Sequence, residues 1–435
     1  MQKIFIIILI LGFVLNQSIC FAEGYKQIDL KTAIDIAKKN NLDIQSSKKD
    51  VDIAKNEIKI SNRLQNPSFD TFWNFGKGGK GNPNQIGMSE TVELFKRGAR
   101  KNLAKVNYSL TSDKYEYQKF NLQMDVTEAY IKLVVAKSIL KKYERQHQFH
   151  EELLAISNLN NKEQNKFDLD TIEAKIALNQ MTTELNKAKT KAKTARLEFN
   201  RIINTTDGNY DTTDTDLTIE NNPININIPQ TSADLPPFKS IEDAAIQNRY
   251  DIKIAKNHID VAEKKLAVIV RKKVPDLNIE GGFAYQTIGL ADDNTFKPGA
   301  YLGASLTNIP VFYSYKPEIK NAQLEIEKAN LEYISTVNKA KKSVEIAYEK
   351  FITAQINLES YNDKILKDSE ELFTLFKQKY KVENVDFAAL AAVEESYQDL
   401  IVGYSEALSD YYISWIDFLR EINSEDFSFN KNPDI

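Results

Sequence analysis

Apolar residues recur at helical spacing along two long stretches of the chain. Neither stretch is interrupted by proline, since none occurs between Pro83 and Pro223 or between Pro317 and Pro433. The spacing predicts long amphipathic helices over about 99–158 and 317–381. Shorter helices are predicted before them, over about 30–63 and 240–273, and returning helices of about 36 residues after them. The residues that carry the pattern are Phe120, Met124, Ile131, Val134 and Val135 in the first stretch, and Ile334, Val337, Val344, Tyr348 and Phe351 in the second.

The pattern changes to strict alternation in two glycine-rich windows that follow Pro67 and Pro275. We predict strands over about 68–76, 84–94, 275–288 and 299–310, forming two hairpins. One face of each hairpin is apolar and the other is polar. The apolar face carries Phe69, Trp73, Phe75, Leu277, Ile279, Phe283 and Tyr285, and the polar face carries Asp70, Asn74, Asp276, Asn278 and Glu280.

Strands of about ten residues with one apolar and one polar face are what a membrane β-barrel needs. Four strands cannot close a barrel, and an open edge cannot lie in lipid. A membrane location therefore requires several chains to share one barrel, and three chains would supply twelve strands. The alternative at this stage is a pair of soluble hairpins packed on one core.

The sequence contains an internal repeat. An offset of 208 aligns Asp43-Ile44 with Asp251-Ile252, and the offset reaches 219 where Ile203-Asn204 meets Ile422-Asn423. The boundaries predicted from this repeat are a first structural repeat over 23–204, a linker over 205–237 and a second repeat over 238–423. A C-terminal tail follows over 424–435, and the two repeats are expected to form one intertwined domain.

The first 22 residues have the pattern of a secretory signal peptide. Lys3 precedes an apolar run from Ile4 to Leu15, and Cys20-Phe21-Ala22 supplies a cleavage site. A lipoprotein signal that uses Cys20 is the alternative. Because Cys20 is the only cysteine of the chain, no disulfide and no thiolate metal site are expected after cleavage.

Composition supports long helices and offers no catalytic motif. Only 15 of 435 residues are glycine and 11 are proline, and the net charge of −4 gives no basic footprint for nucleic acid. His147 and His150 stand three apart on a predicted helix, but no third metal ligand is identifiable. No phosphate-binding loop or nucleophile elbow occurs. We therefore expect no enzymatic activity, no cofactor and no metal.

The chain resembles the TolC family of outer-membrane efflux channels over about 27–423. The resemblance rests on the doubled helix–hairpin–helix order and on three short segments. These segments are Leu30-Lys31-Thr32-Ala33 with Asn40-Asn41-Leu42-Asp43-Ile44, Asn66-Pro67-Ser68-Phe69 entering the first strand, and Phe95-Lys96-Arg97-Gly98-Ala99-Arg100 leaving the second.

The resemblance implies a mainly α fold with a membrane β part, a duplicated helix–β-hairpin–long helical hairpin. Three chains would form a twelve-stranded β-barrel continued by an α-helical tunnel through the periplasm. Such a homotrimer is the outer-membrane exit duct of a tripartite efflux or type I secretion system. Its partners are outer-membrane lipid, a periplasmic adaptor and an inner-membrane pump.

The ends of the two helical hairpins would then form the periplasmic mouth. The family narrows its tunnel there with a ring of carboxylates, for which the candidates are Asp168, Asp170, Asp386 and Glu383. Glu383 departs from the glycine usual in the family, and Ala388 stands opposite Asp170, so Asp168 and Asp386 as ordinary helix N-caps are the alternative. Adaptor contacts are expected at Lys381, Val382 and Val385.

Two alternatives stay open. Tyr404, Tyr411, Tyr412 and Trp415 fit either helix packing or the aromatic belt of a bilayer interface. The rival function is a secreted periplasmic helical rod that acts as a scaffold or binding protein without a pore. Its strands would lie in a protein core, whereas those of a channel would face lipid.

Overall fold

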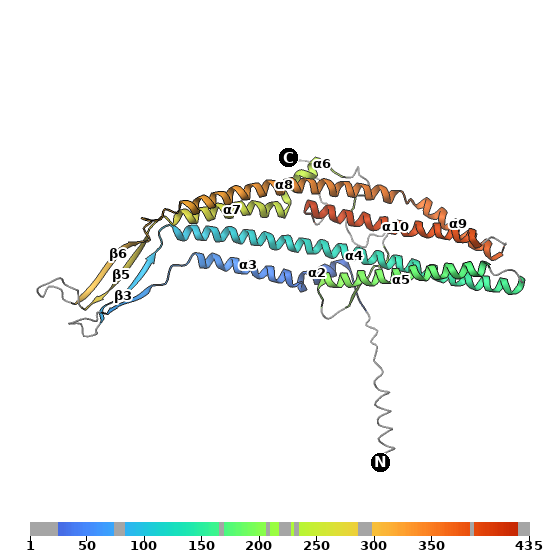
Figure 1. Cartoon of the computed structure of the whole chain (residues 1–435), viewed down its shortest axis with the longest axis horizontal. Coiled ribbons are helices and arrows are strands. Elements are labelled where there is room, and N and C mark those ends of the chain that lie inside the picture. Colours follow the sequence, from blue (N-terminus) through green and yellow to red (C-terminus); the bar gives the residue numbers. More distant parts are fainter. Residues whose placement is uncertain are drawn as a thin grey trace, which may run out of the picture. The chain divides into compact units, whose positions relative to one another are not determined.

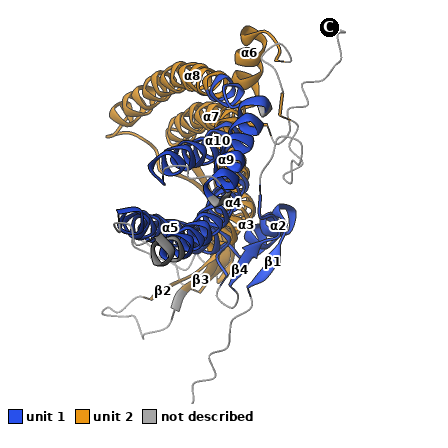
Figure 2. Ribbon diagram, turned by 90° about the vertical axis from the view of Figure 1, so that its right-hand side faces the viewer, with its two compact units in different colours: residues 1–41, 122–226, 354–413 blue, residues 42–121, 227–353, 414–435 orange. Residues whose placement is uncertain are grey.

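A computed structural model describes residues 25–73, 83–164, 169–205, 209–216, 228–229, 235–285, 298–382 and 387–424. The predicted signal peptide with Cys20, and the tail beyond Ser424, lie outside these residues. The described chain divides into two compact units (Figure 2). The first unit comprises 1–41, 122–226 and 354–413, and the second comprises 42–121, 227–353 and 414–435.

The second unit contains a four-stranded antiparallel sheet of order β2-β3-β5-β6. Its strands are β2 (Ser68–Trp73), β3 (Pro83–Val92), β5 (Asp276–Ala284) and β6 (Gly299–Thr307) (Figure 1). All four predicted strands are therefore present, each with fewer residues than expected. The two predicted hairpins join through β3 and β5 into one sheet.

The second unit also contains all or part of six described helices. They are α3 (Leu42–Ser61), the start of α4 (Lys96–Gln164), α6 (Phe238–Asn248), α7 (Tyr250–Arg271), most of α8 (Lys316–Glu359) and the end of α10 (Phe387–Ile422). Of these, α3, α4, α7 and α8 adjoin the strands of the sheet along the chain. The Tyr250 ring lies 6.2 Å from that of Tyr117 and joins α7 to α4. Lys265 pairs with Glu325 at 2.7 Å and joins α7 to α8.

An aromatic cluster forms part of the core of this unit. Phe351, Trp415 and Phe418 are fully buried. The Phe351 ring centroid lies 4.8 Å from that of Trp415 and 6.2 Å from that of Phe418. In the first unit Tyr411 and Tyr412 are also buried. Of the two interpretations left open for these aromatic residues, helix packing is the one the structure supports for Tyr411, Tyr412 and Trp415.

The first unit contains two helical hairpins and a small parallel sheet. Its helices are α2 (Leu30–Asn40), the rest of α4, α5 (Leu169–Ile203), α9 (Asp363–Val382) and the first part of α10. β1 (Lys26–Ile28) pairs in parallel with β4 (Tyr210–Thr212). Sequence analysis missed both strands because three residues are too few to show alternation.

A lysine with a largely covered side chain attaches β4, which belongs to the predicted linker, to α4. Lys137 Nζ donates to Asp211 Oδ1 at 3.0 Å and to the Thr212 carbonyl at 2.8 Å. Arg196 of α5 lies 3.1 Å from the other oxygen of Asp211. Burial raises the pKa of Tyr130, with its bond to Asp214 as the next contribution. This part of the predicted linker is therefore anchored by ion pairs and hydrogen bonds.

Three predicted helices are broken, and the expectation that each was continuous is wrong. The helix expected over 30–63 is interrupted at Asn41, and that over 240–273 at Arg249, both with extended ψ angles near 117° and 129°. Arg249 donates to Asp251 and to the Glu421 carbonyl. These bonds stabilise the break in a run that contains no glycine or proline.

The third break separates α8 from α9. The helix predicted over 317–381 ends at Glu359 and resumes at Asp363. Asn362 Oδ1 accepts the backbone N–H of Ile365 at 2.9 Å, which is an N-cap bond. The apolar period continues through the break, so periodicity alone could not reveal it. Its counterpart α4 is continuous over 69 residues.

The repeat reappears as two matched pairs of left-handed residues. Asn204 and Asn423 have φ angles of 49° and 54° and follow α5 and α10. Their Nδ2 atoms donate to the Asn40 and Asn248 carbonyls at 3.2 and 3.3 Å. Each asparagine thus ends its helix and joins it to the leading helix of its own copy, a use for which asparagine is suited.

The second pair consists of Phe95 and Tyr315, with φ angles of 63° and 55°. Each directly precedes the first residue of a long helix, Lys96 or Lys316. A left-handed conformation costs an aromatic residue about 1–2 kcal/mol. Both copies therefore use a strained turn to pass from sheet to helix. Among the described residues, no helix is both long and apolar enough to cross a bilayer.

We predict that Asn423→Ala lowers the melting temperature more than Asn423→Gly. Both changes remove the bond to Asn248, which contributes about 1 kcal/mol. The alanine variant alone must also hold a Cβ in the left-handed conformation, which lowers the free energy of unfolding by about 1 kcal/mol more. Thermal melting of the detergent-solubilised chain, followed by circular dichroism, gives the order wild type, glycine variant, alanine variant.

Asn338→Ala, on an exposed position inside α8, is the control and leaves the melting temperature unchanged or higher. An Asn423→Ala variant as stable as wild type would contradict this account of the cap.

Candidate functional site

One face of the four-stranded sheet is apolar and open. Directly opposed residues of antiparallel strands share a face, and the register opposes Phe69 to Met88, Ile86 to Phe283, and Leu277 to Leu306. Phe69 is 67% exposed and Leu302 is 84% exposed. The apolar face comprises Phe69, Ile86, Met88, Val92, Leu277, Ile279, Phe283, Leu302 and Leu306.

The exposure of the apolar face argues against the alternative of two soluble hairpins packed on one core. A pair of hairpins packed on a core of their own chain would have one buried face. Here both Phe283 and Ile279 are at least 40% exposed, so no described part of the chain covers the apolar face. Soluble monomers rarely expose a continuous apolar surface of this extent. The face therefore needs a covering that the single chain does not provide.

Several residues depart from the alternation, among them Phe72, which opposes Gln85 on the polar face. Glu90 opposes Ile279 and so lies on the apolar face. The register shifts by one residue between Phe72 and Trp73. This bulge removes Trp73 from the simple alternation, although its side chain is 48% exposed. Tyr285 is exposed just beyond β5, and Phe75 lies outside the described residues.

The opposite face is polar and internally hydrogen-bonded. Ser89 donates to Asp70, and Thr91 donates to Asn278 at 3.3 Å. Glu280 opposes Ser89, and Asp276 opposes Thr307. Four of the five residues predicted to line a lumen thus share the polar face, and Asn74 lies outside the part of the chain that the structure describes. Their exposure to a lumen remains a prediction.

Glycine is required where β3 meets β5 on this polar face. Gly87 opposes Gly282, and a Cβ on Gly282 would lie 2.2 Å from the Ile86 carbonyl oxygen. A Cβ on Gly87 would meet the Tyr301 hydroxyl at the same distance. The Tyr301 side chain of β6 therefore reaches across β5 to β3 and stabilises the three strands on one side.

The sheet is fastened to the helices by buried charges. Lys96 Nζ, at the start of α4, lies 2.8 Å from both carboxylate oxygens of Asp276 in β5. Asn308 donates to the same carboxylate at 2.8 Å. Because both members of the ion pair are largely buried, removing one would leave an uncompensated charge and cost about 3–5 kcal/mol. Asp276, predicted as a lumen residue, thus also holds the sheet to α4.

Both outer strands have a free edge in this chain. β2 pairs only with β3, and β6 only with β5, among the strands described. An unpaired strand edge is a row of hydrogen-bonding groups that can pair with another strand. The sheet therefore presents an apolar face and two edges that the chain alone does not satisfy.

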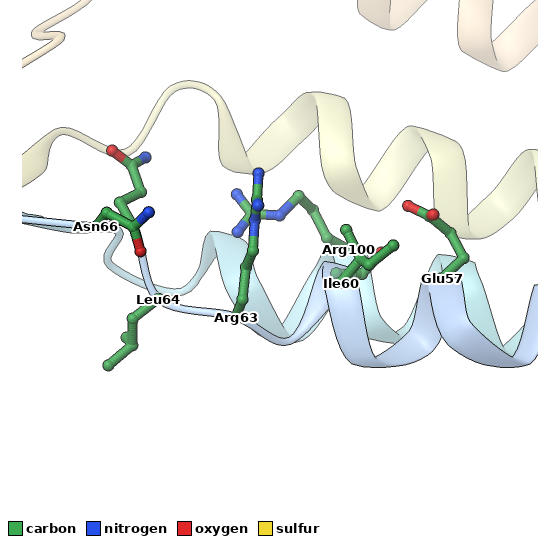
Figure 3. Close-up of a pocket in the computed structure, with 8 residues that line it drawn as sticks. Glu57, Ile60, Arg63, Leu64, Asn66 and Arg100 are labelled. Atoms are coloured by element: carbon green, nitrogen blue, oxygen red, sulfur yellow. The ribbon is translucent and has the colours of Figure 1, made fainter.

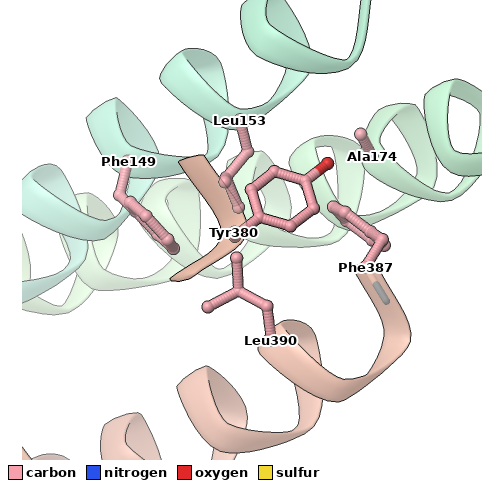
Figure 4. Close-up of a cluster of buried hydrophobic side chains, with 6 residues drawn as sticks. All are labelled: Phe149, Leu153, Ala174, Tyr380, Phe387 and Leu390. Atoms are coloured by element: carbon pink, nitrogen blue, oxygen red, sulfur yellow. The ribbon is translucent and has the colours of Figure 1, made fainter. Parts of the chain in front are cut away.

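The ends of the two helical hairpins are joined by a hydrophobic cluster in the first unit. Figure 4 shows Tyr380 of α9 among side chains of α4, α5 and α10. Burial, and then the nearby charge of Asp170, raise the pKa of Tyr380. The cluster comprises Phe149, Leu153, Ala174, Tyr380, Phe387 and Leu390.

Only one aperture candidate can be placed. Asp170 is exposed in the first turn of α5, next to Thr171, whose hydroxyl lies 3.0 Å from that of Ser157 in α4. Asp168, Glu383 and Asp386 lie outside the described residues, as does the adaptor candidate Val385. Lys381 and Val382 are the last residues of α9. The carboxylate ring therefore stays a prediction, since three of its four candidates lie outside the described residues.

The two histidines have different partners. His150 Nε2 lies 3.2 Å from Glu394 of α10, and both side chains are buried. His147 Nε2 lies 3.1 Å from Thr182 of α5. Within the described ranges, no group of three or more potential ligands could hold a metal ion. Sequence analysis missed the His150–Glu394 contact because its partners stand 244 positions apart.

Comparison with solved structures shows the fold. The chain superposes on a membrane protein from Pseudomonas aeruginosa with a TM-score of 0.72 at 16% identity, covering 92% of this chain and 91% of the other. For the Campylobacter jejuni CmeC outer membrane channel the TM-score is 0.71 at 15% identity, covering 90% and 85%. For the open state of the Neisseria gonorrhoeae MtrE outer membrane channel it is 0.69 at 17%, covering 91% and 89%.

No protein-family profile matches the chain, and no curated protein matches it. The likeness in structure spans nearly the full length of both partners, although fewer than one residue in five is identical. The chain therefore has the fold of these outer-membrane channels, mostly helical with a few strands, as the resemblance to the TolC family implied. The trimeric twelve-stranded barrel stays a prediction.

We predict that Ile279→Asp prevents stable membrane assembly. A carboxylate on the apolar face would lie in lipid, and each such side chain would destabilise the inserted protein by up to about 2 kcal/mol. Asn278→Asp, one residue away on the polar face, is the matched control, because an aspartate can still accept the Thr91 hydroxyl. The measurement is the amount of each variant in washed outer membranes. Equal insertion of both variants would count against a lipid-facing apolar face.

Proposed function

We propose that this chain is the outer-membrane exit duct of an efflux or secretion system. Three copies form one β-barrel, and their helices form a tunnel through which substrates leave. The observation that carries the proposal is the sheet itself, which has an exposed apolar face, a polar face and two open edges. The fold shared with outer-membrane channels supports the same conclusion.

Three of the four described strands of the sheet have the length that a bilayer requires, and β2 is shorter, with six residues. β3, β5 and β6 contain nine or ten residues. At about 3.3 Å per residue and a tilt of about 40°, they reach roughly 23–25 Å along the membrane normal. The apolar band of an outer-membrane barrel is about 25 Å tall. The apolar face would thus meet the hydrocarbon core.

Closure requires other copies of the chain. A strand edge in lipid leaves each N–H and C=O unsatisfied, at several kcal/mol per group. The described strands of this chain leave the outer edges of β2 and β6 unpaired, and strands of other copies would supply the missing partners. Three chains joined β6 to β2 give twelve strands and no edge. The polar face, with Asp70, Asn278 and Glu280, then lines the pore.

The helices of the first unit would form the periplasmic end. Asp168, Asp170, Asp386 and Glu383 are proposed to narrow the aperture, and Lys381, Val382 and Val385 to contact a periplasmic adaptor. The hydrophobic cluster around Tyr380 supports this role because it holds both hairpins together beside Asp170. An inner-membrane pump supplies the energy, so the chain needs no catalytic residue and no cofactor.

The rival function, a secreted helical rod without a pore, requires a protein core around the strands. The exposed fraction of the apolar face argues against that core. Every structure reported above is described as a membrane protein or an outer membrane channel. The duct is therefore the better supported of the two functions.

The proposal predicts ion conductance in planar lipid bilayers. Protein extracted from outer membranes gives discrete conductance steps, and Asp170→Asn lowers the preference for cations measured as a reversal potential in a salt gradient. Glu184→Gln, which removes the same charge farther along α5, is the control and leaves the reversal potential unchanged. Absence of conductance would refute the duct. Conductance with an unchanged reversal potential in Asp170→Asn would remove that residue from the aperture.

A further inference from the structure

Five exposed cations gather where the sheet passes into the helices. Arg63 lies between α3 and β2, and Arg97 lies at the start of α4. Arg271 is the last residue of α7, and Lys272 and Lys273 lie between α7 and β5. We call these five residues the basic patch. In this antiparallel sheet the first residues of β2 and β5 and the last residues of β3 lie at the same end of the strands. The five cations next to them therefore lie at that end of the sheet.

The positive charge of the basic patch is not cancelled locally. Within the described ranges, no carboxylate forms an ion pair with any of its five members. Glu93, the carboxylate nearest in sequence to Arg97, pairs with Arg100, and Asp276, the one nearest to Lys273, pairs with Lys96. The patch thus holds excess positive charge in a chain whose net charge is −4.

An open cavity of about 490 Å³ lies inside this region. Arg63 lines it together with Gln65 and Asn66, and so does Arg100, whose guanidinium already pairs with Glu93 (Figure 3). A single carboxylate, Glu57, lines it in the part of the chain that the structure describes. Guanidinium and amide N–H groups are the donors that bind phosphate oxygens. The lining therefore fits an anionic head group better than a cation.

Exposed apolar side chains flank the basic patch. Phe95 is 71% exposed and held in a left-handed turn, and the Arg271 guanidinium lies 5.8 Å from its ring centroid. Phe312 is fully exposed. This apolar fringe comprises Leu64, Phe95, Ile309, Val311, Phe312 and Tyr313, all at least half exposed. Cations beside exposed aromatic rings are typical of the surface of a bilayer, where rings enter the head groups and cations meet lipid phosphates.

We infer that the basic patch binds the phosphates of anionic phospholipid in the leaflet on the helical side of the membrane, and that the apolar fringe enters the head-group region beside it. This inference rests on the proposed function, because the sheet must lie in the bilayer for the patch to reach its surface. Charge complementarity selects anionic over zwitterionic head groups. The fringe places the cations at the depth of the phosphates.

The test compares lipids retained by the full-length chain in vesicles of phosphatidylcholine with and without phosphatidylglycerol. Wild-type protein is reconstituted into both, extracted in mild detergent, and its bound lipid is measured by mass spectrometry. We expect phosphatidylglycerol to be enriched at least about threefold over the bulk mixture, and the enrichment to fall at 0.5 M salt. The triple variant Arg63→Gln/Arg97→Gln/Lys272→Gln should lose it.

The matched control is Lys49→Gln/Lys256→Gln/Lys339→Gln, which removes three exposed charges from α3, α7 and α8 and keeps the enrichment. Insertion into both vesicles with no lipid preference overturns the inference and leaves the duct standing. Failure to insert into either vesicle overturns both. Loss of the oligomer in the triple variant with an unchanged lipid ratio assigns the patch to subunit contact and also overturns the inference.

Discussion

A strand edge cannot be left open in hydrocarbon, and the account of this chain depends on that constraint. The sheet carries an apolar face that no described part of the chain covers. It also has two edges with no partner among the described strands. Each feature alone has several solutions, such as a protein partner for the face or a charged residue for the edge. Lipid for the face and further copies of the sheet for the edges satisfy both together.

The junction between sheet and helices shows how the chain meets a second requirement. An α-helix and a tilted strand have different repeats, so the chain must turn sharply between them. Phe95 and Tyr315 make that turn in the left-handed region, one in each copy. The ion pair between Lys96 and Asp276 then fastens the first turn of α4 to β5. Conformational strain and buried charge thus occur together at the level proposed for the membrane surface.

Duplication explains why equivalent solutions appear twice and where they differ. Asn204 and Asn423 make the same bond to the leading helix of their own copy. The breaks at Asn41 and Arg249 occupy equivalent positions, yet only Arg249 is held by two carboxylates. The long helix of the first copy is continuous, whereas that of the second is interrupted before Asn362. The two copies have therefore kept the backbone plan and diverged in the side chains that stabilise it.

Much of this architecture could be predicted from sequence because it is periodic. The alternation around Ile279 and the helical spacing around Val134 can both be recognised from residues close together in the sequence. The breaks at Asn41, Arg249 and Ser360 could not be predicted, because no glycine or proline marks them and their stabilising partners are local caps or distant carboxylates. The His150–Glu394 contact and the strand pair β1–β4 depend on residues far apart in sequence. At the hairpin ends, only Asp170 of the aperture candidates lies among the described residues.

The central claim is that several copies of this chain share one barrel, and the most direct measurement is the mass of the native assembly. The protein would be extracted from isolated outer membranes in mild detergent and its mass determined before and after heating. The account predicts a trimer that dissociates on heating. A monomer that needs no detergent and is recovered in the soluble periplasmic fraction would contradict it.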